Sequence, residues 1–129
     1  MDINVLVTGG VGNSAAGESA TRFCDAAVAA GHKITQVFFY ESGVSQLNHL
    51  IEPLSDEFNS VTAWQNVARK TGCPLVVCVS AGERRGVIGR EQAAENQLDS
   101  ITLGDDVEVA GLASFWAACL ASDRTVTFR

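Results

Sequence analysis

Four cysteines are the most reactive side chains in this sequence of 129 residues: Cys24, Cys73, Cys78 and Cys119. Cys78 stands apart because a serine, a glycine and the pair Arg84–Arg85 follow it within seven positions. If a helix begins near Ser80, its free amide groups and the positive end of its dipole lie close to the sulfur. The arginines add positive charge, and both effects favour a thiolate, the nucleophilic form of cysteine. We therefore predict that Cys78 is the catalytic residue, against the alternative of a buried strand cysteine.

The other three cysteines have simpler interpretations. Cys24 and Cys119 fall on the apolar stripes of predicted helices, where free cysteine packs as a small hydrophobic residue. Cys73 precedes a proline in the turn that enters a strand, so we expect an exposed, inert thiol at the amino edge of the sheet. A disulfide between Cys73 and Cys78 is excluded if the strand is extended. Five residues then span about 16 Å, whereas the Cα atoms of a disulfide lie within about 7 Å.

The two histidines do not indicate a metal site. The sequence contains no C-x-x-C motif, and His32 and His49 lack the spacing of metal ligands. His32 is predicted to lie in a turn at the amino edge of the sheet. His49 follows the second predicted strand and is close enough in sequence to approach a site there, but no partner for its ring is evident. We expect neither a metal nor a cofactor.

A glycine-rich loop offers a competing function. Gly9–Ser14 follows the first predicted strand and precedes a helix, which is where a nucleotide phosphate binds in many α/β proteins. Glu41, at the end of the second strand, resembles the acidic ribose ligand of dinucleotide-binding folds. The Walker lysine is absent, however. The loop is interpreted as a tight turn that needs a positive φ, or alternatively as the cradle of a nucleotide or flavin.

The elements that position these residues alternate along the chain. Apolar, β-rich runs predict strands at Ile3–Thr8, Lys33–Tyr40, Leu75–Val79 and Thr125–Phe128. Helical stripes predict helices at Ala15–Ala30, at Asp56–Lys70 with Ser55 as the N-cap, and at Gly111–Ala121. Shorter helices or turns are expected at Gly43–Leu50, Ser80–Arg85 and Gln92–Gln97. In the last long helix the residues expected to point inward are Leu112, Phe115, Trp116, Cys119 and Leu120.

Strands separated by helix-length segments predict a mostly parallel sheet with helices on both faces, that is, a three-layer α/β/α domain. The length of the chain predicts a single domain over residues 1–129. In such sheets reactive groups lie beyond the carboxyl ends of the strands, near the point where the strand order reverses. That rule favours Cys78 over Cys73 and over His32.

Charge and hydropathy narrow the possible partners. Nine basic and fifteen acidic residues give a net charge of −6, which argues against direct nucleic-acid binding. No apolar run approaches the eighteen or so residues that cross a bilayer. The first ten residues contain no basic leader, so we expect a cytoplasmic protein in which the four cysteines stay reduced.

Several segments together carry a resemblance to a known family. They are Val37–Tyr40 with Gly43–Val44, Ser55–Phe58, Ala63–Gln65, Cys78–Val87 with its Arg-Arg-Gly, Gly111–Leu112 and Ser122–Phe128. In this order and at this spacing they resemble the DsrE/TusD family of sulfurtransferase subunits. The resemblance spans nearly the whole chain and implies a flavodoxin-like (DsrE-like) α/β fold. It also implies that Cys78 carries sulfur as a persulfide. Two departures, at Gly82–Glu83 and in the loop Gly9–Gly17, bear on which donor is preferred.

The same resemblance implies a set of partners. Members of this family work in a heterohexamer with TusB- and TusC-like subunits. They take sulfur from a TusA-like donor and pass it to a TusE-like acceptor, toward 2-thiouridine at the tRNA wobble position. A DsrE-type subunit of a sulfur-oxidation complex is the alternative. Candidate partner contacts are the apolar residues of the upper loops, Val44, Leu47, Leu50 and Ile51.

Overall fold

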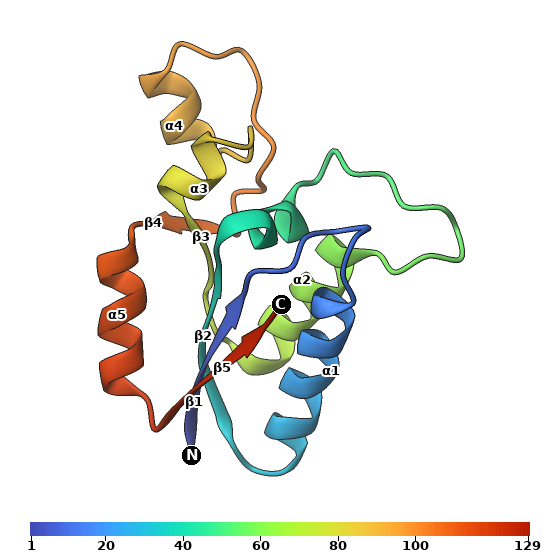
Figure 1. Cartoon of the computed structure of the whole chain (residues 1–129), viewed down its shortest axis with the longest axis vertical. Coiled ribbons are helices and arrows are strands. Elements are labelled where there is room, and N and C mark those ends of the chain that lie inside the picture. Colours follow the sequence, from blue (N-terminus) through green and yellow to red (C-terminus); the bar gives the residue numbers. More distant parts are fainter.

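The computed structural model describes residues 1–129 and contains one five-stranded sheet (Figure 1). The strands are β1 (Asp2–Val7), β2 (Lys33–Phe39), β3 (Leu75–Cys78), β4 (Glu108–Ala110) and β5 (Arg124–Phe128). All neighbouring strands are parallel, in the order β4-β3-β2-β1-β5. The predicted parallel α/β fold is confirmed. The strand order reverses between β1 and β5, so Cys78 on β3 lies at the carboxyl edge but two strands away from β1.

Helices cover both faces of the sheet. α1 (Ala16–Ala29) and α2 (Ser60–Thr71) pack together on one face, and α5 (Leu112–Ala121) lies on the other (Figure 1). Two consecutive residues of β2, Phe38 and Phe39, contact helices on opposite faces of the sheet, because successive side chains of a strand point to opposite faces. Phe38 packs against Phe115 of α5, with ring centroids 5.1 Å apart, and Phe39 packs edge-on against Trp64 of α2 at 5.0 Å.

The central strands are apolar because they are covered on both sides. All four residues of β3 are buried, as is most of β1 and β2. Parallel strands in this position have continuous apolar runs rather than alternating ones, which explains why the sequence predicted them well. β4 was not predicted, because three residues at the edge of a sheet leave too short a pattern.

The start of α2 differs from the prediction. Helix α2 begins at Ser60, and its N-cap is Asn59, whose side chain accepts a hydrogen bond of 3.2 Å from the Thr62 amide. Ser55 is not the cap. The residues before α2 form a separate turn, in which the backbone of Leu54 and both the backbone and the carboxylate of Glu57 bond to one another. Serine and asparagine are both residue types that cap helices. Ser55 lies in the turn that precedes α2, and Asn59 is the cap of the helix.

A 3-10 helix, η1 (Glu41–Leu47), follows β2 and packs against α2 and the short helix Val79–Glu83 that follows β3. It lies so close to the end of β1 that a Cβ at position 43 would overlap the Val7 carbonyl oxygen. Position 43 therefore requires glycine because a side chain would clash with β1, and not because of its backbone angles. Of the predicted partner contacts in this region, Val44 and Leu47 belong to the core, whereas Leu50 and Ile51 are exposed.

Helix α5 is where the predicted core differs most from the observed one. Only Phe115 is buried, and Cys119 is half-buried. Leu112, Trp116 and Leu120 are 40%, 62% and 89% exposed. The prediction that they point inward is wrong because α5 carries no charged residue, so its pattern does not distinguish one face from another.

Two short helices, α3 (Val79–Glu83) and α4 (Arg90–Glu95), lie above the carboxyl edge of the sheet (Figure 1). None of the helices combines the length and the apolar character required to cross a bilayer.

Candidate functional site

Cys78 is the last residue of β3 and the N-cap residue of α3. Its partner in the neighbouring strand is Ala110 of β4. The sulfur lies 3.5 Å from the hydroxyl oxygen of Ser80, and either atom has a hydrogen to donate. The predicted position at the carboxyl edge, next to the start of a helix, is therefore observed. The contact with Ser80 was not anticipated, although a hydroxyl two residues after a strand-ending cysteine is visible in the sequence.

The thiol of Cys78 is covered in the single chain. Only 1% of the residue is exposed, whereas Val79 is half-buried and Ser80 is exposed. Helix α3 follows directly, and η1 packs against both α3 and β3. A Cβ on Gly82 would overlap the Val87 carbonyl oxygen, so α3 lies tightly against the chain that follows it. Cys78 is therefore buried at the start of a five-residue helix, although the exposed Ser80 follows only two positions later.

The two arginines are not part of the immediate surroundings of Cys78. Arg84 and Arg85 follow the last residue of α3 and are exposed. Arg85 donates a hydrogen bond of 3.1 Å to the Ala81 carbonyl, and no hydrogen bond or ion pair joins either arginine to the cysteine. The structure thus places the basic pair at the far end of α3.

The other three cysteines lie on helices or in the turn after α2. Cys24 is completely buried, as predicted, and Cys119 is half-buried, where its sulfur accepts hydrogen bonds from Asn4 and Thr125. The prediction that Cys73 is exposed is wrong, because only 6% of it is accessible. The turn after α2 folds inward there, held by a 3.1 Å bond from the Cys73 amide to the Thr71 hydroxyl. None of the four is in a disulfide.

Because Cys24 and Cys73 are buried, the free energy of unfolding is expected to fall as the pH rises into the alkaline range. Loss of hydration, with a smaller contribution from Cys73, raises the pKa of Cys24 to about 12, and burial also raises the pKa of Cys73. In the unfolded chain these thiols ionise near pH 8.5. The unfolded state thus binds fewer protons above that pH. The free energy of unfolding should fall by about 1.4 kcal/mol per pH unit for each thiol until its folded pKa is reached.

Urea unfolding at pH 8, 9 and 10 measures this slope. Replacing Cys24 by alanine should remove the contribution of one thiol from the slope, while leaving the contributions of the other ionisable groups in place. An identical slope in wild type and C24A would contradict the assignment.

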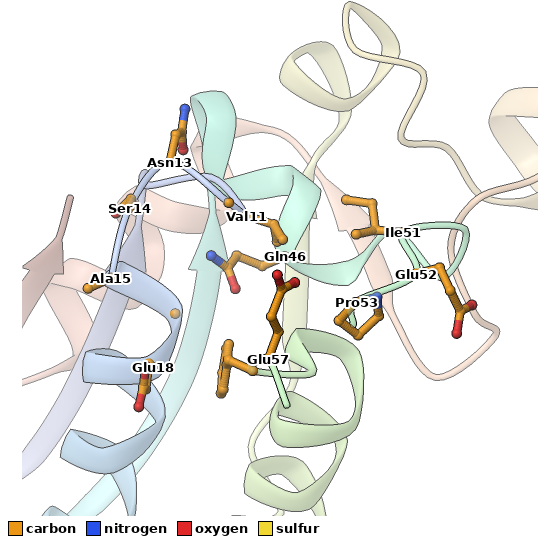
Figure 2. A pocket seen from close by; sticks show the side chains of 13 residues that line it. Val11, Asn13, Ser14, Ala15, Glu18, Gln46, Ile51, Glu52, Pro53 and Glu57 are labelled. Carbon is orange, nitrogen blue, oxygen red and sulfur yellow. The ribbon is translucent and has the colours of Figure 1, made fainter. Parts of the chain in front are cut away.

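The glycine-rich loop borders a cavity of about 740 Å³ between the start of α1 and the residues that precede α2 (Figure 2). Glu18, Glu52 and Glu57 are among the residues that line it, and the carboxylate of Glu57 points toward Gln46. The negative charge of three acidic residues around the cavity opposes the binding of a phosphate. Glu41 lies outside this cavity, in a separate one at the ends of β1, β2 and β5.

The geometry of the loop supports its interpretation as a turn. Gly12 has a φ of +87°, a conformation that glycine adopts without strain. The amides of Val11 and Ala16 are already bonded to the hydroxyls of Ser45 and Ser14, at 3.0 Å each. Gly17 leaves room for the side chain of Gln46, which a Cβ would overlap. The glycines therefore let the loop pack onto η1.

The histidines are also accounted for. Nδ1 of His32 lies 3.0 Å from the amino group of Met1. His49 is exposed, and its backbone amide bonds to the Thr102 carbonyl. No group of three His, Cys, Asp or Glu side chains is placed to hold a metal ion.

A parallel five-stranded sheet with helices on both faces defines a three-layer α/β protein, and Cys78 lies at the carboxyl end of its strand β3. The solved structure of the ychN protein from E. coli has this fold, with a TM-score of 0.77, 16% identity and 99% of each chain covered. Residues 1–128 match the model of the DsrE/DsrF-like family. The chain belongs to this family.

Relatives of known name agree with the family. The chain is 43% identical to "Sulfurtransferase TusD" of Proteus mirabilis, covering 96% of this chain and 95% of that protein. It is 40% identical to the protein of the same name in Serratia proteamaculans, covering 99% of each. A "Sulfurtransferase TusD homolog" of Vibrio vulnificus is 38% identical, with 96% and 95% covered. The predictions of a DsrE/TusD-type chain and of a sulfurtransferase in a sulfur relay are confirmed.

Proposed function

We propose that this chain carries sulfur as a persulfide on Cys78 and that the sulfur is destined for 2-thiouridine in tRNA. The relatives named sulfurtransferase TusD, similar over nearly the full chain, support the activity. The observation that carries the residue assignment is that Cys78 alone among the four cysteines lies at the carboxyl end of a strand, two residues from an exposed hydroxyl. Cys24, Cys73 and Cys119 lie on helices or in the turn after α2.

The reaction is an exchange between sulfur atoms, with no net oxidation. The Cys78 thiolate attacks the outer sulfur of a donor persulfide. A new sulfur–sulfur bond forms on Cys78, the bond in the donor breaks, and the donor cysteine leaves as a thiolate. The proton of the donor's outer sulfur stays with the transferred atom, so that Cys78 becomes a persulfide. A thiolate of the acceptor then attacks that outer sulfur and releases Cys78 for the next cycle.

The proposal includes the proteins on each side of the chain. A TusA-like carrier supplies the sulfur and a TusE-like protein accepts it, while TusB- and TusC-like subunits complete a heterohexamer. Residues 1–129 act in it as one DsrE-like unit. We place the chain in the cytoplasm, where its four free thiols stay reduced. With a net charge of −6, the chain delivers sulfur toward tRNA without binding it.

Access to the sulfur is part of the mechanism. The thiol is 1% exposed in the single chain, and exchange requires the attacking sulfur to reach it. The residues inferred to move are Val79 and Ser80 at the start of α3, because they directly follow Cys78 and the hydroxyl of the exposed Ser80 contacts the sulfur. Contact with a donor or a neighbouring subunit is the event that displaces them. Between transfers, the same cover protects the persulfide from small thiols.

Two measurements test the proposal as a whole. Incubation with a persulfide donor, followed by mass spectrometry of peptides, should locate added sulfur on Cys78. Cells that lack the chain should also lack 2-thiouridine in their tRNA, and restoring the wild-type chain should return it. Normal 2-thiouridine in those cells would instead favour a role in sulfur oxidation.

Ser80 is expected to position the thiol. Its hydroxyl, 3.5 Å from the sulfur, is the side chain that holds Cys78 in its observed orientation. Replacing Ser80 by alanine should slow sulfur loading several-fold, because a single hydrogen bond contributes about 0.5–1.5 kcal/mol. The S80T variant keeps the hydroxyl and should restore most of the rate. Stability should change little, since Ser80 is exposed. Equal loading rates in S80A and wild type would contradict this role.

A further inference from the structure

The cavity at the ends of β1, β2 and β5 lies where the strand order of the sheet reverses. The chain passes from β1 outward through β2, β3 and β4, and then returns to the other side of β1 as β5. Ligands of parallel α/β sheets bind beyond the carboxyl ends of the strands at this point. The cavity measures about 630 Å³, within the roughly 300–1,000 Å³ that is usual for small-molecule sites. The polar residues that line it are Thr8, Tyr40, Glu41, Thr127 and Arg129.

This cavity and the side chain of Cys78 lie on the same face of the sheet. The pairing of β1 with β2 and of β2 with β3 puts Thr8, Tyr40 and Cys78 in one row across the three strands. Because side chains alternate between faces along a strand, this row points to the same side as Phe38, toward α5. Neighbouring strands are about 5 Å apart. The half-buried Tyr40 lines the cavity and is the next residue in the row to Cys78, so the cavity ends about one strand spacing from the thiol.

Two opposite charges on the cavity have no ionic partner in the chain. Glu41 and Arg129 are both exposed, and neither takes part in an ion pair. Glu41 also has a φ of +53°, a left-handed conformation that is costly for a residue with a long side chain. Strain of this kind is concentrated at ligand sites.

The two charges restrict the chemistry of the ligand. One carboxylate and one guanidinium on the same cavity are complementary to a molecule that carries one ammonium group and one carboxylate, as an amino acid does. A phosphate fits less well, because its negative charge would meet that of Glu41. The proximity of Cys78 adds a second requirement, since a ligand that reacts there must bring a sulfur atom.

We propose that this cavity binds a small thiol of the amino-acid type in its persulfide form, which donates sulfur directly to Cys78. Arg129 binds the carboxylate of the donor and Glu41 binds its ammonium group. The persulfide then extends along the row past Tyr40 to Cys78. The inference rests on the proposed function for the role of Cys78, and it adds a class of donor that needs no carrier protein.

The transfer from such a donor involves no net oxidation. The Cys78 thiolate attacks the outer sulfur of the bound persulfide, a new sulfur–sulfur bond forms, and the sulfur–sulfur bond of the donor breaks. The donor leaves as a thiolate, and the proton of the outer sulfur stays with the transferred atom. A thiol held by the same two charges also reverses the transfer, whereas the cover of Cys78 excludes small thiols that lack them.

Binding is tested with S-methylcysteine and S-methylglutathione, which carry the ammonium and carboxylate groups but cannot transfer sulfur. Isothermal titration calorimetry on the full chain should show saturable binding of at least one of them, and the one that binds shows whether the donor is a single amino acid or a tripeptide. R129Q and E41Q should each weaken binding about tenfold, because each loses one charge-assisted hydrogen bond.

The matched controls keep both charges of the cavity. R124Q changes an arginine at the other end of β5, and E52Q changes a glutamate of the other large cavity. Both should bind the S-methyl compounds like wild type. All four substituted side chains are exposed, so each variant should unfold at the wild-type temperature.

Sulfur transfer is tested with the persulfides of cysteine, glutathione and 2-mercaptoethanol, of which the last is uncharged apart from its sulfur. Mass spectrometry should show that wild type loads Cys78 from an amino-acid-type persulfide at a lower KM than from the mercaptoethanol persulfide. This preference, as a ratio of kcat/KM values, should fall about tenfold in R129Q and in E41Q. The change should lie in KM rather than in kcat, because the two charges bind the donor and do not react.

Three results would overturn the proposal: no binding of either S-methyl compound, an equal loss of binding in the controls, or an unchanged donor preference in R129Q and E41Q. If the mercaptoethanol persulfide still loads Cys78 in wild type, the donor site fails alone and the relay function stands. If none of the three persulfides loads Cys78, the relay function itself fails, and the donor role of the cavity fails with it.

Discussion

Replacing Cys78 by serine is expected to abolish sulfur loading. Wild type exposed to a persulfide donor should gain about 32 Da, the mass of one sulfur atom, on the peptide that contains Cys78. C78S has no thiolate there to attack the donor, and serine does not replace it at neutral pH because its hydroxyl is far less acidic. The loss should exceed a hundredfold in rate, measured by mass spectrometry of the intact protein and of its peptides.

The matched control for C78S is the same change at Cys119. That sulfur is partly accessible and accepts hydrogen bonds from Asn4 and Thr125, which a hydroxyl also can accept. C119S should load at the wild-type rate. An adduct that persists in C78S and disappears in C119S would move the reactive sulfur to α5. In cells that lack the chain, C78S should restore less 2-thiouridine in tRNA than wild type does, while the complex still assembles. That result would show that Cys78 is also required in cells.

Replacing Trp64 by alanine is expected to be the most destabilising change to the core. Trp64 is fully buried, packs edge-on against Phe39, and donates a hydrogen bond of 3.3 Å to the side chain of Gln46. Truncating a buried tryptophan costs about 3–5 kcal/mol, a large share of the roughly 5–15 kcal/mol by which such domains are stable. Urea unfolding followed by circular dichroism measures the loss, and W64F, which keeps most of the ring volume, should lose less.

The other tryptophan provides the control. Trp116 is 62% exposed, so W116A should change the free energy of unfolding of the isolated chain by about 0.5 kcal/mol or less. If W116A destabilised the chain as much as W64A, the position of α5 relative to the sheet would be wrong.

Trp64 also connects stability with the site. Gln46, which accepts the Trp64 hydrogen bond, is also bonded to Ser60 and to the Gly9 carbonyl. It belongs to η1, the element that packs against α3 and β3 beside Cys78. The buried amide thus ties α2 and the glycine-rich loop to the segment next to the thiol. A defect at position 64 is therefore expected to loosen the cover of Cys78 as well.

Much of the fold was determined by local patterns in the sequence. The apolar runs of β1, β2 and β3 predict buried parallel strands, because only strands covered on both faces lack polar alternation. Gly31 and Gly72 end their helices with φ of +88° and +70°, which follows from glycine's freedom in that conformation. Cys78 was singled out by its place between a strand and a helix, and the structure puts it at that point.

What the sequence did not determine depends on contacts between distant segments. Cys73 appeared exposed because a turn before a proline is usually at the surface, but its burial results from how the turn after α2 meets the sheet. The covering of Cys78 by its neighbours is likewise tertiary. The inward and outward sides of α5 were undetermined, since a helix without charges has no polar face to mark the solvent. Local patterns determined the strands, the helices and the position of Cys78 at a strand end, whereas the packing of distant segments decided which apolar side chains stayed exposed.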